Sequence, residues 1–287
     1  MDKKRREFLK IAGISTLAGL GGQAVVTRLV TGDTPVNARA DEHESTGREH
    51  DDSHGAEAAG HGAEHAEKPT GKRYGMVIDM RAFRAHPGLA AKCVKACHRE
   101  HNVPNFPNKK DEVKWIWLTE YEKAFTEHSN YYRSKVIEED QFPVLCNHCD
   151  KPPCVRACPT KATFKNKDGI IMMDFHRCIG CRFCMAACPY GSRSFNWRDP
   201  RPFINKADLN PHFPTRMRGV VEKCNFCADR LAIGKKPACV EACGDTEALV
   251  FGDLNDPNSQ IRKLLHTVNT LQRKPAMGTL PSVFYIV

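Results

Sequence analysis

Three runs of closely spaced cysteines constrain the fold of this 287-residue chain more than any other feature. Twelve of the fourteen cysteines belong to these runs. The runs are Cys146-x2-Cys149-x4-Cys154-x3-Cys158-Pro159, Cys178-x2-Cys181-x2-Cys184-x3-Cys188-Pro189 and Cys224-x2-Cys227-x11-Cys239-x3-Cys243. To predict the fold, we first ask which metal or cofactor these thiols bind.

The second run has the spacing C-x2-C-x2-C-x3-C-P, which is that of bacterial ferredoxins. Two residues between thiolates let a tight loop wrap one corner of a four-iron, four-sulfur cube. A small residue such as Gly180 lets backbone N–H groups approach the sulfur atoms. Pro189 turns the chain away, and the fourth cysteine, Cys188, reaches a different cluster.

Three other uses of cysteine compete with iron–sulfur clusters. Disulfides are the usual expectation for an even number of cysteines in an exported protein, but these runs place the thiols too close in sequence for a sensible set of bridges. Zinc also binds C-x2-C pairs, yet one tetrahedral site does not need a fourth ligand that is sent elsewhere. Interlocked runs also disfavour thioredoxin-like chemistry at a single C-x-x-C. Iron–sulfur clusters are the favoured interpretation.

The N-terminus has the features of an export signal. The pair Arg5-Arg6 precedes a modest apolar run over residues 11–26, and Ala38 and Ala40 form an A-x-A cleavage pattern. This arrangement resembles a twin-arginine signal over residues 1–40, with cleavage after Ala40; an uncleaved, tethered protein is the alternative. The formal net charge of +9 is partly in this leader, so we expect no nucleic-acid partner.

Residues 41–72 lack aliphatic side chains larger than alanine, which predicts a disordered linker. Its histidines are interpreted as part of a solvated segment, with transient metal binding as the alternative; they are His43, His50, His54, His61 and His65. Beyond it we expect strands near residues 74–78, 169–174 and 248–253 and short helical turns after the cysteine runs. The aromatic-rich segment 114–135 is interpreted as an insertion that packs on the outside or meets a partner.

The cysteine runs, together with "KCNFCADRLAIGKKPACVEAC" and "FGDLNDPNS", resemble the four-cluster ferredoxin-type electron-transfer subunits of bacterial respiratory complexes. That family includes the beta subunits of the polysulfide, tetrathionate and dimethyl-sulfoxide reductases. The resemblance covers residues 73–287. The export signal and the "VKWIW" segment are most similar to the periplasmic iron–sulfur O subunit of the sulfite-reductase-associated Dsr membrane complex.

The resemblance implies an α+β fold with two ferredoxin-like units related by pseudo-symmetry. Each would have a small antiparallel sheet and short helices around Fe–S clusters. The first unit would combine residues 73–110 with 215–257, and the second would span 140–200. Residues 111–139 would be an inserted segment. Residues 258–287 would form a C-terminal tail whose apolar end lies against the core or a membrane partner.

The resemblance also implies the ligand sets of three complete [4Fe-4S] clusters. Each run contributes three ligands to one cluster, and a fourth comes from the run paired with it. The first set is Cys146, Cys149, Cys154 and Cys188; the second is Cys178, Cys181, Cys184 and Cys158; the third is Cys224, Cys227, Cys239 and Cys97.

Two cysteines, Cys93 and Cys243, are left without a complete set. In the family a fourth cluster would need two more ligands, but Phe83 and His86 stand near those positions, and Phe83 cannot ligate iron. We expect this fourth site to lack a normal cluster. Cys93 and Cys243 would then face one another as a disulfide or as free thiols, a smaller iron cluster or a fourth [4Fe-4S] cluster being the alternatives.

The resemblance implies a periplasmic electron-transfer subunit at the outer face of the cytoplasmic membrane. Its partners would be an integral quinone-interacting subunit of the polysulfide-reductase membrane type and a cytochrome c or other redox subunit. The alternative is a reductase with a redox-active Cys93/Cys243 pair. From its place inside a cysteine run, His148 would tune a cluster or face a partner, or else lie at the surface or just behind the ligands. The cations beside the ligands would favour reduced clusters or form a solvated face; they are Lys151, Arg156, Arg177, Arg182 and Lys223.

Overall fold

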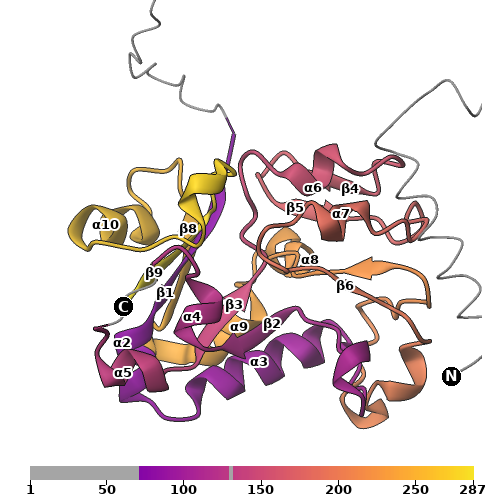
Figure 1. Cartoon of the computed structure of the whole chain (residues 1–287), viewed down its shortest axis with the longest axis horizontal. Helices are drawn as coiled ribbons and strands as arrows, with labels where there is room; N and C mark the ends of the chain where they lie inside the picture. Colours follow the sequence, from indigo (N-terminus) through magenta and orange to yellow (C-terminus); the bar gives the residue numbers. More distant parts are fainter. Residues whose placement is uncertain (1–70, 129–131) are drawn as a thin grey trace, which may run out of the picture. The chain divides into compact units, whose positions relative to one another are not determined.

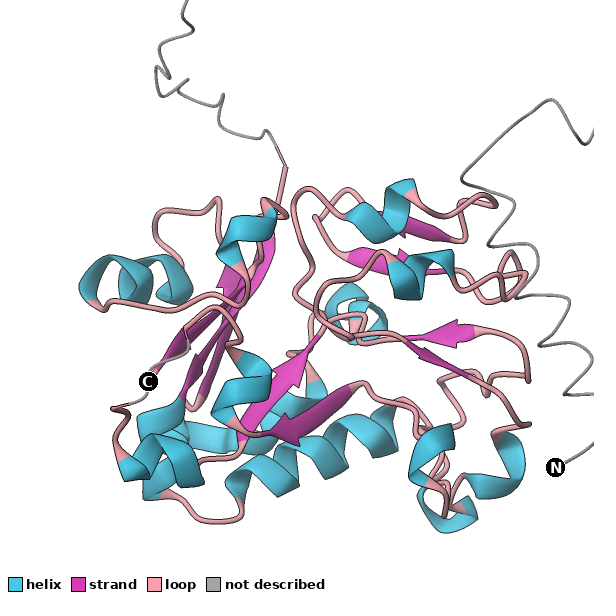
Figure 2. Cartoon of the chain, in the orientation of Figure 1, coloured by secondary structure: helices cyan, strands magenta, loops and turns pink. Residues whose placement is uncertain are grey.

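The computed structural model describes residues 71–128 and 132–287. Within them, short helices and small sheets are joined by loops (Figure 1, Figure 2), which confirms the predicted α+β class. The expected export signal (1–40) and all but the last two residues of the expected linker (41–72), with its five histidines, lie outside the described residues. No helix of the described residues is long and apolar enough to cross a membrane.

A three-stranded sheet joins segments from the two ends of the described chain. β1 (Tyr74–Asp79) lies between β8 (Leu249–Asp253) and β9 (Val283–Ile286), antiparallel to β8 and parallel to β9. The strands expected at both β1 and β8 are present. We expected the apolar C-terminus to lie against either the core or a membrane partner, and it forms β9 of this sheet. Its parallel pairing with β1 differs from the purely antiparallel sheets that we expected. α10 (Gln260–Thr267) packs on β8.

Two helices carry the cysteines that lie outside the ferredoxin-spaced loops. In α3 (Leu89–Glu100), Leu89, Cys93 and Cys97 recur every four residues, which places them on one face of the helix. All three are buried, and α9 (Ala238–Cys243) packs closely against α3. Packing of these two helices therefore brings four cysteines from distant parts of the sequence together.

The segment that we expected to be an external insertion belongs to the core, so that expectation is wrong. β2 (Ile116–Thr119) pairs antiparallel with β3 (Phe142–Leu145), the strand that leads into the first cysteine run. Trp115 and Phe125 are each only 1 % exposed. Aromatic side chains bury large apolar areas, and here Trp115 packs on His101 and Phe213 while Phe125 packs on Phe142 of β3.

The central cysteine runs lie on a small unit of hairpin and single-turn helices. β4 (Thr163–Lys165) pairs with β5 (Ile171–Met173), which is the strand expected over 169–174. α6 (Pro153–Arg156) and α7 (Phe183–Ala186) are short helical turns that pack against one another, but they lie within the first two cysteine runs and not after them as expected. The other elements are α2 (Met80–Ala85), η2 (Lys109–Asp111), α4 (Tyr121–Ala124), α5 (Lys135–Glu139), β6 (Ser194–Phe195), η3 (Arg201–Phe203), η4 (Lys206–Asp208), β7 (Val221–Glu222), α8 (Ala228–Ala232), η5 (Gly244–Thr246) and η6 (Pro275–Met277).

Candidate iron–sulfur sites

Four cysteines from two runs surround one small cavity, which we call site I. Cys146, Cys149 and Cys154 of the first run and Cys188 of the second line it. Cys154 is on α6, and Cys188 lies just beyond α7, so the packing of these two helices closes the set. These are the same four residues that the sequence resemblance predicted for one cluster.

A second set of four cysteines lines another small cavity, site II. Cys178, Cys181 and Cys184 come from the second run, and Cys158 comes from the first. Cys184 is buried, but the other three are only partly buried. Site II also matches a predicted set, and it is the most exposed of the cysteine sites.

The third predicted set meets at the α3–α9 packing and is called site III. Cys97 lies on α3 and Cys239 on α9, while Cys224 follows β7 and Cys227 precedes α8. All four are buried. Burial and the charges of the three neighbouring thiols raise the pKa of Cys97 well above its ordinary value. Thiolates here need a positively charged group, such as a metal cluster, to be stable.

The described residues fit clusters better than single metal ions. No group of three or more His, Cys, Asp or Glu side chains among them is placed to hold one ion. A zinc site would place its sulfur ligands about 2.3 Å from a single centre, whereas a cube holds its thiolates further apart. Cysteines arranged around a cavity suit the wider spacing of a cube better than a single zinc ion. With clusters bound, sites I, II and III would supply one-electron redox chemistry.

The three sites are neighbours, and site I contacts the electrostatic surroundings of both others. The charge of Cys146 in site I acts on Cys224 in site III, and the charge of Cys154 in site I acts on Cys184 in site II. Site I is therefore adjacent to both of the other sites. This arrangement is what a stepwise electron relay needs.

Buried cations lie between the sites, and one of them was not anticipated from the sequence. Arg193 is 5 % exposed; burial alone would lower the pKa of its guanidinium, but thiolates of sites I and II, Cys154 first, raise it. Its Nη1 donates to Thr163 Oγ1 (3.1 Å), and its buried Nη2 has no partner among the described residues. An unpaired buried N–H beside thiolates suits a bond to cluster sulfur. Arg193 lies outside every cysteine run, so spacing could not have indicated it.

The cations predicted beside the ligands divide into two groups. Lys223 is 1 % exposed, donates to the Cys224 carbonyl (2.8 Å) and to the Ile171 carbonyl, and lies within the charge field of Cys146. Burial lowers the pKa of its amine. The other four are exposed, which fits a solvated or partner-facing surface; they are Lys151, Arg156, Arg177 and Arg182.

His148 is a buried neutral histidine, so the surface alternative for it is wrong. Its ring is 1 % exposed and stacks on Phe226 with ring centroids 3.7 Å apart. Burial, with Lys223 nearby, lowers its pKa well below the ordinary value. The Ile171 N–H donates to Nδ1 (3.1 Å), so the ring hydrogen is on Nε2, which has no partner among the described residues. This arrangement suits a donor to cluster sulfur, the tuning role considered for it.

The loops that carry the cysteines need unusual backbone conformations. Gly180 has φ +72°, and a Cβ there would lie 2.5 Å from the Gly219 carbonyl oxygen, so only glycine fits. Backbone N–H groups do approach sulfur: those of Thr163, Phe226 and Ala238 lie 3.4–3.5 Å from the Sγ atoms of Cys158, Cys224 and Cys227 respectively. Such bonds stabilise thiolates and raise cluster potentials.

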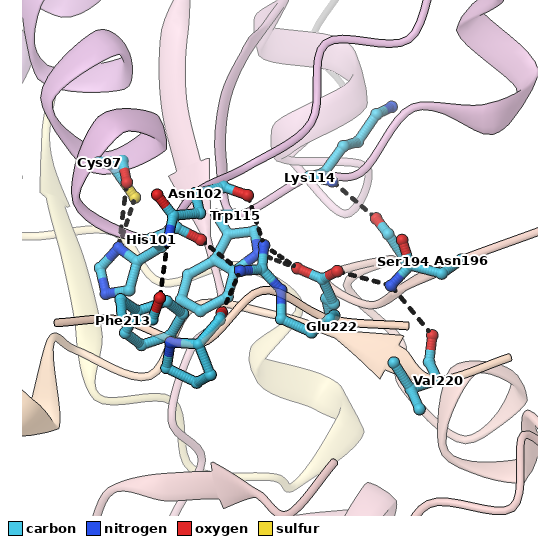
Figure 3. Close-up of polar contacts among 12 residues, drawn as sticks. Cys97, His101, Asn102, Lys114, Trp115, Ser194, Asn196, Phe213, Val220 and Glu222 are labelled. Carbon is cyan, nitrogen blue, oxygen red and sulfur yellow. Dashed lines mark hydrogen bonds and ion pairs between the residues drawn. The ribbon is translucent and has the colours of Figure 1, made fainter. Parts of the chain in front are cut away.

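A buried polar network adjoins site III through the end of α3 that carries Cys97 (Figure 3). His101 donates from Nδ1 to the Cys97 carbonyl (3.0 Å) and stacks on Trp115. Trp115 Nε1 donates to Glu222 (2.9 Å), which also pairs with Arg216 at 2.7 Å. Burial lowers the pKa of His101 to about 4, so the ring is neutral. The sequence reasoning missed this network because its residues come from four separate segments.

Cys93 and Cys243 lie together, one helical turn from site III. Their Sγ atoms are 3.1 Å apart, and the two residues are 0 % and 3 % exposed. Phe83 is buried in the same apolar cluster, whereas His86 is exposed and donates from Nδ1 to the Ala82 carbonyl (2.9 Å). The described residues thus bring only two possible iron ligands to the fourth position. Whether the pair is oxidised stays a prediction.

Comparison with known proteins identifies the family. The model of a 4Fe-4S dicluster domain matches twice, over residues 137–209 and 198–254. The sequence is 42 % identical over 234 residues to the Hdr-like menaquinol oxidoreductase iron–sulfur subunit 1 of Archaeoglobus fulgidus, covering 75 % of this chain and 83 % of that protein. This protein belongs to the ferredoxin-type iron–sulfur subunits of respiratory reductases.

Two further members of this family are similar over nearly the same span. A polysulfide reductase polypeptide of Wolinella succinogenes is 37 % identical over 218 residues, covering 75 % of this chain and 94 % of that protein. A tetrathionate reductase polypeptide of Salmonella typhimurium is 35 % identical over 221 residues, covering 75 % and 72 %. The protein is thus an iron–sulfur electron-transfer subunit, and two dicluster matches agree with the two expected ferredoxin-like units.

Proposed function

We propose that this subunit relays electrons one at a time through three [4Fe-4S] clusters, held at sites III, I and II in that order. The single observation that carries the proposal is the group of three complete four-cysteine sets, in which site I is adjacent to the other two. The ligands are those that the sequence resemblance implied. Buried Arg193 and Lys223 offset the negative charge that each reduced cluster gains.

Site II is the end at which the relay meets a redox partner. Three of its four cysteines are only partly buried, whereas all of site III is buried. Ile179 and Phe183, within the same run, are 67 % and 61 % exposed, and Trp197 is 46 % exposed. The exposed Arg182 guanidinium lies over the Trp197 ring at 4.6 Å. Exposed aromatic and aliphatic groups with a cationic rim favour a partner surface that is apolar at its centre and acidic at its edge.

The partners that we propose are an integral membrane subunit that reacts with quinone and a cytochrome c or other redox subunit. The relatives named as menaquinol oxidoreductase and polysulfide reductase polypeptides support a quinone-linked role in sulfur metabolism. The twin-arginine pattern at Arg5-Arg6 supports export, which would place the subunit at the outer face of the cytoplasmic membrane. The narrower similarity to the O subunit of the Dsr complex belongs to this proposal.

The experiment is metal analysis and spectroscopy of the purified full chain, followed by recovery of its complex from membranes. We expect about twelve iron atoms and a similar amount of labile sulfide per chain, four for each of three cubes. The reduced protein should give iron–sulfur EPR signals. Zinc in place of iron, or an EPR-silent reduced form, would overturn the relay. About sixteen iron atoms would overturn the three-cluster count.

Two variants test docking and export separately. Phe183→Asp should leave the iron content unchanged but reduce recovery of the membrane and haem partners; Ile233→Asp, at another exposed apolar position, is its control. Replacement of both Arg5 and Arg6 by lysine should retain the protein in the cytoplasm. Unchanged partner recovery for Phe183→Asp contradicts the site II interface, and unchanged export contradicts the proposed location.

The alternative of a reductase that acts through Cys93 and Cys243 has less support. Such an enzyme must admit its substrate to the thiols, yet these two residues are 0 % and 3 % exposed. Turnover of a small sulfur compound by the isolated subunit would favour this alternative over the relay.

A further inference from the structure

The two cysteines outside the three sites are placed by the same pair of helices that builds site III. Cys93 and Cys97 are four residues apart on α3, and Cys239 and Cys243 are four residues apart on α9. Each pair therefore lies on one helix face. At a rise of about 1.5 Å per residue, the Cys93–Cys243 contact is roughly 6 Å along the helices from the site III ligands.

The two sulfur atoms already have the proximity that bond formation requires. The Sγ–Sγ separation of 3.1 Å is only about 1 Å longer than a disulfide bond, so the two sulfur atoms need little further approach. Both belong to an apolar cluster with Phe83 and Leu89. An uncharged disulfide suits that environment better than a thiolate does.

The surroundings exclude a standard ligand role for the pair. At the position where two further iron ligands would be required, Phe83 contributes a ring, and the imidazole of His86 is exposed and bonded to Ala82. Two thiols alone cannot complete the four-ligand set of a [4Fe-4S] cube.

We propose that Cys93 and Cys243 form a two-electron dithiol/disulfide centre that exchanges electrons with the adjacent relay. On oxidation each thiol loses one proton and one electron, an S–S bond forms, and two protons and two electrons leave. The protons pass to water, since a solvent-open cleft of about 720 Å³ follows the α3–α9 seam and is lined by Lys92 and Ala242, the immediate sequence neighbours of the pair. A cluster at site III would accept the two electrons one at a time, the first passing on along the relay before the second arrives, so this inference rests on the proposed function.

The test uses the full-length purified chain with its metal content intact and no added thiol. One sample is oxidised with ferricyanide and one is reduced with dithionite; each is denatured in acid and then alkylated. Trypsin releases Cys93 in a peptide, residues 93–95, that is separate from the peptide containing Cys97, while Cys239 and Cys243 share residues 236–262. The mass of the linked peptide therefore excludes Cys97, and fragmentation between Cys239 and Cys243 assigns the bond to Cys243.

We expect the linked peptide in the oxidised sample and its loss, with two more alkylated thiols, in the reduced sample. The double variant Cys93→Ser/Cys243→Ser should lose this two-thiol difference and keep its iron content. Free thiols in both samples overturn the centre, and so does a link that persists after reduction. A loss of about four iron atoms in the double variant overturns it by showing a fourth cluster. Iron content and EPR of the unaltered protein report separately on the relay, so either idea can fail alone.

Discussion

The buried ion pair behind site III allows a quantitative test of what holds that site together. Glu222 and Arg216 side chains are both 0 % exposed and 2.7 Å apart. The Glu222 carboxylate also accepts hydrogen bonds from Trp115 Nε1 (2.9 Å) and Asn196 Nδ2 (2.5 Å). Replacing Glu222 by leucine leaves a buried guanidinium and two N–H groups without their acceptor. Loss of one partner of a buried pair costs about 3–5 kcal/mol.

The size of that loss converts directly into a denaturation midpoint. A decrease of about 4 kcal/mol in the free energy of unfolding, with a guanidinium m-value of about 4 kcal/mol/M, lowers the midpoint by about 1 M. The assay follows far-UV circular dichroism and cluster absorbance together. Because Cys224 is two residues beyond Glu222, we expect cluster absorbance from site III to be lost first.

Two comparison variants make the result interpretable. Asp111→Asn removes a pair with Arg198, whose side chain is 65 % exposed, and should cost no more than about 1 kcal/mol. The double variant Glu222→Leu/Arg216→Met removes both charges and should recover part of the loss. If Glu222→Leu lowers the midpoint no further than Asp111→Asn does, the reasoning about the buried charge is refuted.

Three other predictions concern the sites themselves. Cys97→Ser should reduce the iron content by about four atoms of twelve and remove only the site III signal, as shown by EPR; loss of all iron would contradict separate sites. Arg193→Met should lower the reduction potentials of the clusters at sites I and II by on the order of 50–100 mV, because a buried cation favours the reduced cluster. An EPR redox titration measures this shift. Arg177→Met, which removes an exposed partner of Asp174, should leave the potentials unchanged. Gly180→Ala should abolish site II absorbance, since its Cβ would meet the Gly219 carbonyl at 2.5 Å. Gly234→Ala, at a similar φ of +74° but in open space, should cost only about 1–2 kcal/mol of backbone strain. Equal behaviour of the two variants would show that the close contact is unimportant.

The cysteine spacing predicted much of the candidate site because cluster loops are local structures. Two or three residues between thiols set the loop geometry whatever surrounds it, and the structure gathers Cys146, Cys149 and Cys154 at one cavity accordingly. Strands β1, β5 and β8 were also predictable, since each is a short apolar segment between glycine, proline or cysteine positions. Which run completes which set came from the family resemblance, not from spacing.

Other features could not be predicted because they depend on contacts between distant segments. Trp115 is buried because His101 and Phe213, from distant segments, pack on its ring, and nothing in its own sequence neighbourhood distinguishes a core tryptophan from one that meets a partner. The burial of His148 depends in the same way on stacking against Phe226, 78 residues later in the sequence. Arg193 is a site residue only because the fold brings thiols of two runs, such as Cys154 and Cys184, close to its guanidinium.

The sequence by itself determined that this protein binds iron–sulfur clusters, because ligand type and loop spacing are short-range chemistry. Only the tertiary structure decided how the three sites adjoin, which cations lie between them, and that Cys93 meets Cys243, 150 residues away in the sequence. The physical reason is that helix α3 and helix α9 each repeat their cysteines every four residues, but only their packing brings the two faces together.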